Sequence, residues 1–186
     1  MIKDLFKHSI WQSNFYSELK EYSYNIERQD ESVRKSNRGG FQSKLLDTSA
    51  DILRPLITHI QNETHKYSKA AFNIDRHYAV GGMWININRH KDFNLTHTHP
   101  GCLFSGVYYI TAPKDCGLLV FDNPYIDGME SHWYHNVNTN FNIYNSFRIK
   151  VKPVAYSMIL FPSYYKHSVD PNEGGEDRIS ISFNLS

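Results

Sequence analysis

The 186-residue sequence contains only two cysteines, Cys102 and Cys116, and neither lies in a CxxC motif. Disulfide-stapled secreted domains and thiolate zinc sites need several suitably spaced cysteines, so neither is expected. The first eleven residues lack a long apolar core and a small-residue cleavage site. No stretch approaches the length of a transmembrane helix. We therefore expect a cytoplasmic protein without a signal peptide and without a membrane partner.

An excess of charge of either sign is also missing. The chain has 20 Lys and Arg against 19 Asp and Glu, a formal net charge of +1 at pH 7. Proteins that bind nucleic acids or acidic membrane surfaces do so largely through concentrated positive charge. The composition therefore gives no reason to expect a nucleic-acid partner, and it leaves a homodimer open.

Aromatic residues are abundant instead: 13 Tyr, 11 Phe and 3 Trp. Such a composition favours strands over a helical bundle. The spacing of apolar residues changes from helical to strand-like at Tyr78. At this length one domain is expected, with helical support over residues 1–77 and a β core over residues 78–186.

Two helices are expected in the N-terminal part, after an extended segment that runs to Ser13 and is anchored by Leu5, Phe6, Ile10 and Trp11. The first helix should begin at Asn14, with Ser13 or Asn14 as its cap. Its apolar residues recur at helical spacing: Phe15, Leu19, Tyr22 and Ile26. The second helix should span residues 49–73 and tolerate Pro55 in its first turns. Its buried stripe should consist of Ile52, Leu53, Leu56, Ile57 and Ile60.

Strands are expected at 79–89, 103–112, 118–122, 148–151, 157–161 and 178–185, separated by Gly, Pro, Asn and Asp. Because helices come first and strands do not alternate with helices, a twisted antiparallel double sheet fits better than a parallel α/β sheet. The helices should cover one face of it. The polar and aromatic stretch 123–145 is too long for a hairpin turn and is typical of a lid, a binding loop or a mobile insertion.

Three histidines stand out as candidate metal ligands. His97 and His99 are two residues apart, so in an extended strand both imidazoles lie on one face and can converge on one ion. His167 follows an apolar run and supplies a third donor. Neutral imidazole nitrogen suits Fe, Zn, Cu and Ni. The remaining histidines lack this context and are interpreted as ordinary: His8, His59, His65, His77, His90, His132 and His135.

Arg178 is a candidate anion-binding residue. It opens a strand in which Arg178, Ser180, Ser182 and Asn184 share one face and Ile179, Ile181 and Phe183 share the other. Arginine suits bidentate capture of a carboxylate, although a surface ion pair with Glu176 or Asp177 remains an alternative. The turn over residues 170–175 suggests that the strands of His167 and Arg178 are antiparallel neighbours.

Taken together, several ordered motifs resemble the 2-oxoglutarate- and Fe(II)-dependent oxygenases. They are Met83-Trp84-Ile85-Asn86, Asn94-Leu95-Thr96-His97-Thr98-His99-Pro100, Ser105-Gly106-Val107-Tyr108-Tyr109, Phe161-Pro162-Ser163 with His167, and Arg178-Ile179-Ser180-Ile181-Ser182-Phe183-Asn184. With the upstream stretch 36–43, the chain resembles more narrowly a poorly characterised microbial and phage-associated set with an H-x-H…H pattern. The resemblance implies a double-stranded β-helix (a jelly-roll or cupin-like barrel) and the cofactors Fe(II), 2-oxoglutarate and O2. It also implies a dioxygenase that decarboxylates 2-oxoglutarate and hydroxylates a C–H bond.

The resemblance also assigns roles to single residues. His97 and His167 match iron ligands, and Arg178 matches the residue that binds the far carboxylate of 2-oxoglutarate. Ser180, Tyr109 and Asn94 are expected to contact the cosubstrate. His99 departs from the better-known members, which carry Asp or Glu at this position. It is expected to complete the metal-binding and catalytic triad, with Asp122 as the alternative ligand.

Two other classes remain open. A cupin-like metalloprotein of another reaction class would also use an H-x-H pair, but its usual glutamate a few residues later is missing from residues 101–105. A non-catalytic jelly-roll binding module would leave the convergence of the histidines and Arg178 unexplained. The substrate itself is not indicated, and a small metabolite, a free amino acid or a peptidyl side chain all fit.

Overall fold

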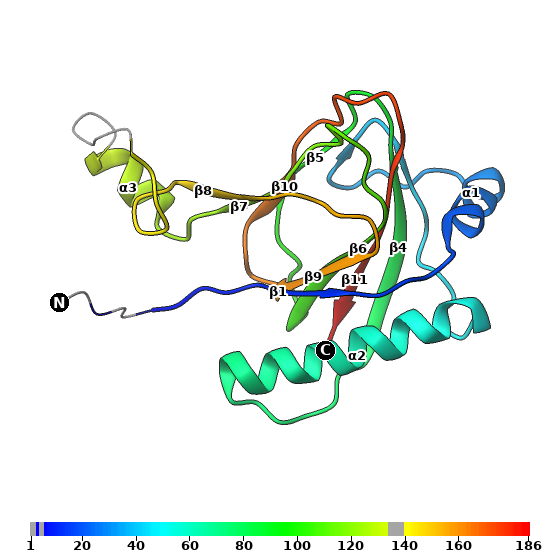
Figure 1. The fold of residues 1–186 in the computed structure, drawn as a ribbon, viewed down its shortest axis with the longest axis horizontal. Coiled ribbons are helices and arrows are strands. Elements are labelled where there is room, and N and C mark those ends of the chain that lie inside the picture. Colours follow the sequence, from blue (N-terminus) through cyan, green and yellow to red (C-terminus); the bar gives the residue numbers. More distant parts are fainter. Residues whose placement is uncertain (1–2, 4–5, 134–139) are drawn as a thin grey trace.

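The computed structural model describes residues 3, 6–133 and 140–186, and it consists mainly of two antiparallel sheets (Figure 1). The six-stranded sheet has the order β1 (Trp11–Asn14), β9 (Ser157–Pro162), β6 (Phe104–Thr111), β11 (Arg178–Leu185), β4 (Val80–Asn88) and β3 (Phe41–Gln42). The five-stranded sheet has the order β2 (Asn37–Arg38), β5 (Phe93–His97), β10 (His167–Val169), β7 (Leu119–Asp122) and β8 (Arg148–Val151). The expected antiparallel double sheet is therefore confirmed.

All six expected strands are present, as β4, β6, β7, β8, β9 and β11, with ends that differ from the expected ones by at most one residue. Strand β5 was anticipated only as the extended segment that carries His97, and β1, β2, β3 and β10 were not expected at all. The four unexpected strands have only two to four residues, which is too few to establish an alternating pattern.

The first helix, α1, spans Lys20–Gln29, so its expected start at Asn14 is wrong. Residues 11–14 instead pair with β9 as strand β1, with Trp11 opposite Leu160 and Asn14 opposite Ser157. Long-range pairing has overridden the local capping signal. The apolar positions were identified correctly, because Leu19 is buried and Phe15, Tyr22 and Ile26 pack against the same core. Of the expected anchors, Phe6 is 76% exposed, which corrects that assignment, and Leu5 lies outside the described residues.

The second helix agrees closely with the prediction. A short 3-10 turn (η1, Asp51–Leu53) leads into α2 (Arg54–Phe72), with Pro55 in the first turn. Asn73 ends the helix in the left-handed conformation, a common helix stop. None of the described helices is long and apolar enough to cross a membrane.

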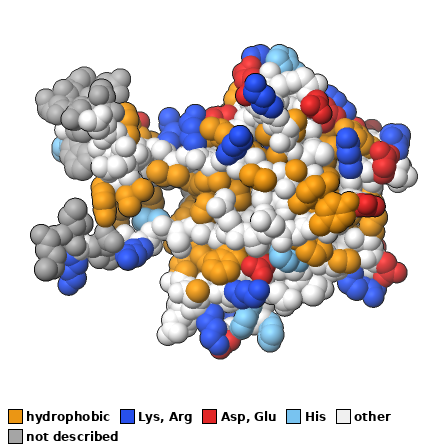
Figure 2. Space-filling view, viewed as in Figure 1, with side chains coloured by type: hydrophobic (Ala, Val, Ile, Leu, Met, Phe, Trp, Pro, Cys, Tyr) orange, Lys and Arg blue, Asp and Glu red, His pale blue; other side chains and the backbone are white. Residues whose placement is uncertain are grey.

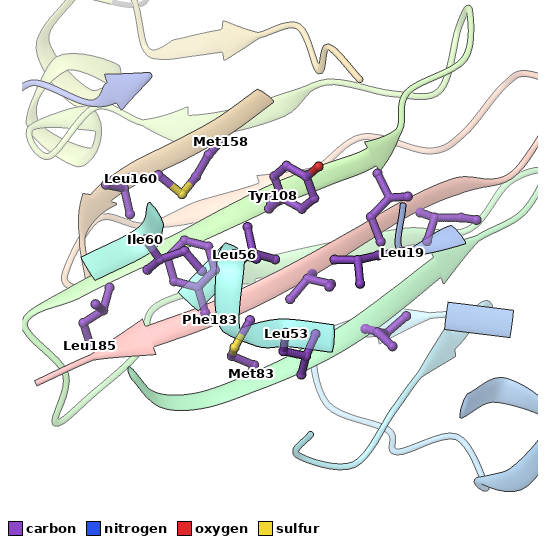
Figure 3. Close-up of a cluster of buried hydrophobic side chains, with 14 of the residues drawn as sticks. Leu19, Leu53, Leu56, Ile60, Met83, Tyr108, Met158, Leu160, Phe183 and Leu185 are labelled. Carbon is purple, nitrogen blue, oxygen red and sulfur yellow. The ribbon is translucent and has the colours of Figure 1, made fainter. Parts of the chain in front are cut away.

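Helix α2 packs on the apolar face of the six-stranded sheet. Leu53, Leu56 and Ile60 of η1 and α2 lie over Met83 and Phe183 of β4 and β11 (Figure 3). Ile52 was expected in the same stripe but is 46% exposed. The apolar residues of β11 are therefore committed to the helix side of the sheet, and its polar residues face the other sheet.

Strands β10 and β11 are not neighbours, which corrects the expectation from the intervening turn. Strand β10 pairs with β5 and β7, whereas β11 pairs with β4 and β6. Residues 170–177 therefore cross from one sheet to the other. As a result, His167 and Arg178 lie on opposite walls of the space between the sheets.

The stretch 123–145 carries a short helix, α3 (Ile126–Trp133), at the end of β7 and β8. This lobe projects away from the body of the two sheets (Figure 1). It exposes several large apolar side chains, and Figure 2 shows hydrophobic side chains on this part of the visible face. They are Tyr125, Phe141, Ile143 and Tyr144. The expectation of a lid, a binding loop or a mobile insertion stays a prediction, and His135 lies outside the described residues.

Candidate metal and cosubstrate site

The structure brings the three candidate histidines together. His97 ends β5 and pairs in register with His167 of β10, and His99 follows in the next turn. Nε2 of His99 lies 3.3 Å from Nε2 of His167. One nitrogen from each of the three rings lies within 4.8 Å of the others, so a single metal ion could contact all three. Strand pairing thus brings together two candidate ligands, His97 and His167, that are 70 residues apart in the sequence.

Hydrogen bonds orient two of the three rings. Nδ1 of His97 lies 2.7 Å from the carbonyl oxygen of Leu95, and Nδ1 of His167 lies 2.9 Å from that of Tyr165. A carbonyl oxygen can only accept, so each Nδ1 carries the proton and donates it. The Nε2 lone pair is then left for a metal, the arrangement typical of ligating histidines.

Burial lowers the pKa of all three imidazoles. The pKa of His99 falls to about 4, with a smaller contribution from His97. Burial likewise lowers the pKa of His167 to about 3. The pKa of His97 is also lowered by burial, against the opposing effect of its bond to Leu95. The rings are therefore neutral at pH 7, which is the protonation state that binds metals.

His99 lies outside the strand, and a buried polar network holds its backbone. Its N–H donates to the carbonyl oxygen of Ser163 at 3.0 Å. The Ser163 hydroxyl lies 2.7 Å from that of Ser105, which in turn donates to Oδ1 of Asn184 at 2.8 Å. Ser105 and Asn184 were not predicted to belong to the site, although both lie in motifs that resemble the oxygenases. Their importance depends on pairing across β6, β9 and β11.

Arg178 is buried, with 1% of its surface exposed, which excludes the surface ion pair. Its Nη1 donates to the carbonyl oxygens of Cys116 and, at 3.3 Å, Asp170. Nη2 has no partner among the described residues. Gly117, which has a φ of +83°, packs against this pair of groups. A Cβ at this position would lie 2.2 Å from the backbone carbonyl oxygen of Asp170 and 2.8 Å from Nη1 of Arg178. The chain therefore encloses half of the guanidinium and leaves the other half unpaired.

The histidines and Arg178 line one cavity of about 810 Å³ between the two sheets. Ser180 and Tyr109, which are paired in register across β11 and β6, also line it. Asn94 does so as well, with its amide donating to the Ser36 hydroxyl at 3.2 Å. Burial raises the pKa of Tyr109, against the opposing charge of Arg178, so the phenol is neutral. The cavity therefore contains every residue that was predicted to bind metal or cosubstrate.

Asp122, the alternative metal ligand, lies elsewhere. Its Oδ1 accepts a hydrogen bond from Nε of Arg148 at 2.9 Å across β7 and β8. It is not part of the donor cluster found among the described residues. The geometry therefore favours His99 as the third donor.

Comparison with known proteins agrees with this site. The model of a family described as "Putative 2OG-Fe(II) oxygenase" matches residues 82–184, which is more than half of the chain. The chain belongs to this oxygenase family. Members of the family use Fe(II), 2-oxoglutarate and O2. No curated protein matches the chain in sequence.

Solved structures of 2-oxoglutarate oxygenases share the fold. A prolyl-4-hydroxylase from Pseudomonas putida superposes with a TM-score of 0.66 at 15% identity, covering 96% of this chain and 92% of its own. The viral collagen prolyl hydroxylase of Paramecium Bursaria Chlorella virus-1, in complex with 2-oxoglutarate, gives 0.57 at 15% identity, covering 95% and 94%. HygX from Streptomyces hygroscopicus, with nickel and 2-oxoglutarate bound, gives 0.63 at 10% identity, covering 96% and 83%. The double-stranded β-helix is thereby confirmed for this oxygenase.

The residues present fit the cofactors of the family. Three neutral nitrogen donors suit a divalent iron ion. The unpaired half of Arg178 is a buried cationic donor on the opposite wall, which suits a carboxylate. A dianionic acid that chelates a metal at one end and meets an arginine at the other matches both features.

Proposed function

We propose that this oxygenase is a hydroxylase in which His97, His99 and His167 hold Fe(II) and Arg178 anchors 2-oxoglutarate. The observation that supports it most directly is the buried, unpartnered Nη2 of Arg178 in the same cavity as the histidine cluster. An unpaired buried donor normally carries an energetic penalty. A carboxylate in this cavity would relieve it.

The protein side of the site would act mainly by positioning. Carbonyl oxygens of Leu95 and Tyr165 hold two imidazoles with Nε2 free. The carbonyl oxygens of Cys116 and Asp170 hold the guanidinium of Arg178. Ser180 and Tyr109 supply neighbouring hydroxyl groups for the same anion. Bound iron would supply the redox chemistry, the activation of O2 that couples decarboxylation of 2-oxoglutarate to oxidation of a substrate C–H bond.

The test is Fe(II)-dependent conversion of 2-oxoglutarate to succinate, together with calorimetric titration of 2-oxoglutarate into the Ni(II)-loaded protein. Arg178→Ala leaves the bound carboxylate without its cation, which costs roughly 3–5 kcal/mol. We expect affinity to fall by a few hundredfold or more. Arg178→Lys should retain part of the affinity, because it keeps the charge and loses the fork geometry.

Arg148→Ala is the matched control, because this arginine is bonded to Asp122 on the outer strand β8. It should leave the affinity for 2-oxoglutarate unchanged. Metal-loaded wild-type protein that neither binds 2-oxoglutarate nor forms succinate would refute the proposal.

A further inference from the structure

A segment that contributes none of the three histidines or Arg178 forms part of the cavity wall. We call residues 33–45 the rim segment. Its strand β2 pairs with β5 of the five-stranded sheet, and its strand β3 pairs with β4 of the six-stranded sheet. The rim segment therefore bridges the two sheets beside the cavity, between α1 and α2 along the chain (Figure 1).

The connection between β2 and β3 depends on two glycines. Gly39 and Gly40 have φ angles of +69° and +62°, and a Cβ on Gly40 would meet the carbonyl oxygen of Ile87 at 2.7 Å. Glycine adopts this conformation without strain. The tight turn fixes the rim segment against β4, where Ser43 and Leu46 donate backbone hydrogen bonds to Ile85 and Met83.

An apolar wall connects the rim segment to the metal site. The Trp84 ring lies 5.8 Å from the His99 ring, centre to centre. Two residues earlier on the same face of β4, Gly82 lies beneath the Leu45 side chain, which would be 3.3 Å from a Cβ there. Leu45 is 69% exposed, and both Leu45 and Trp84 line the cavity. An apolar surface therefore runs from His99 to the outside.

The charged side chains among the described residues that line the cavity are all positive. Lys35 and Lys44 of the rim segment line the cavity, and none of the described residues that line it is Asp or Glu. The only other charged lining residue in that described set is Arg178, which the cosubstrate would neutralise. A third metal ligand that is histidine rather than a carboxylate leaves one further positive charge uncompensated. A second anion would therefore be attracted to the opening.

We propose that the prime substrate is an anionic molecule with an apolar part, whose acidic group binds Lys35 and Lys44. Its apolar part lies on Trp84 and Leu45, next to His99. This inference rests on the proposed function, because it requires 2-oxoglutarate to occupy the Arg178 end of the cavity. The rim segment then selects the substrate while the two sheets hold the cofactors.

Lys35 and Lys44 could have two simpler roles than binding the substrate: a surface ion pair, or attraction of 2-oxoglutarate. Nζ of Lys44 lies 3.5 Å from Oδ1 of Asp30, with the lysine side chain largely exposed, and such surface pairs are weak. The lysines could also attract 2-oxoglutarate itself, which is a dianion. The experiment therefore measures the affinity for 2-oxoglutarate and for a second anion independently.

The probe is benzoate, with benzamide as its neutral isostere, titrated calorimetrically into protein saturated with Ni(II) and 2-oxoglutarate. We expect saturable benzoate binding that weakens with salt and at least about tenfold weaker binding of benzamide. Each exposed charge contributes up to about fivefold. Lys35→Gln/Lys44→Gln should therefore weaken benzoate binding by about tenfold and leave the affinity for 2-oxoglutarate within about twofold.

Lys69→Gln/Lys114→Gln is the control, because it removes the same charge from two exposed lysines outside the cavity lining. It should change neither affinity. The inference would be overturned if benzoate showed no saturable binding, if benzamide bound equally well, or if the control pair weakened benzoate binding as much as the rim pair. It would also be overturned if the rim variant weakened only the binding of 2-oxoglutarate. If 2-oxoglutarate itself does not bind, the proposed function fails first and this inference with it.

Discussion

At the scale of single residues, position 99 distinguishes the proposed metal centre from one that has a carboxylate ligand. His99 provides a neutral donor, its backbone is held by Ser163, and its ring lies beside Trp84. Asp122 is bonded to Arg148 instead. Moving Asp122 to the metal would break that ion pair, whereas His99 is already within 3.3 Å of His167.

We therefore expect His99→Ala to lower the affinity for Ni(II) by more than about 100-fold, because even outer-shell changes at metal sites cost 10- to 100-fold. Asp122→Ala should lower it less than about threefold, since this residue would act only through β7. Calorimetric titration of both variants measures the difference. His132→Ala, an exposed histidine of α3, is the control. A reversed order of His99 and Asp122 would identify the carboxylate as the ligand.

At the scale of the elements, β11 contributes side chains to both faces of its sheet, the apolar core on one and the cavity on the other. Ile179, Ile181 and Phe183 are fully buried in the cluster that contains α2, while Arg178 and Ser180 face the cavity. Helix α2 thus stabilises the sheet from the face opposite the metal site. Its contribution should appear in the stability of the fold and not in ligand binding.

Leu56→Ala should accordingly lower the free energy of unfolding by about 2–5 kcal/mol, the usual cost of a fully buried leucine. Ile52→Ala should lower it by less than about 1 kcal/mol, because this side chain is half exposed. Chemical denaturation of both variants provides the comparison. Affinity for 2-oxoglutarate should be unchanged in folded Leu56→Ala protein, and a large loss would place α2 in the binding site after all.

At the scale of the whole molecule, the cavity is lined by residues of both sheets. The histidines come from the five-stranded sheet and its following turn, and Arg178 comes from the six-stranded sheet. A ligand that contacts both walls cross-links them. Such a ligand binds only the folded state and therefore raises its stability by mass action.

Ni(II) and 2-oxoglutarate, each at about 100 times its dissociation constant, should stabilise the protein by about 2.7 kcal/mol per ligand, or about 5 kcal/mol together. For a chain of this size that corresponds to a rise in Tm of roughly 5–10 °C from each ligand and roughly 10–20 °C from both. A thermal melt followed by circular dichroism measures it. Arg178→Ala should lose the part of the shift that 2-oxoglutarate adds to that of Ni(II). A full additional shift in this variant would show that the acid binds elsewhere.

The sequence by itself determined the features that depend on local periodicity. A strand repeats every two residues and a helix every 3.6, so such features can be recognised within a short stretch of sequence. They include the two-residue spacing of His97 and His99, the alternation of β11 and the apolar stripe of α2. The longer strands and the second helix could be predicted for the same reason. The motifs around these residues also indicated the family.

Only the tertiary structure decided which elements are neighbours. The local signal at Ser13 and Asn14 favoured a helix cap, but pairing with β9 made these residues a strand. The turn after His167 suggested a hairpin, yet β10 and β11 belong to different sheets. The half-paired state of Arg178 and the bridge formed by residues 33–45 likewise depend on contacts between distant segments. Such contacts depend on the packing of the whole chain, so no short stretch of sequence contains them.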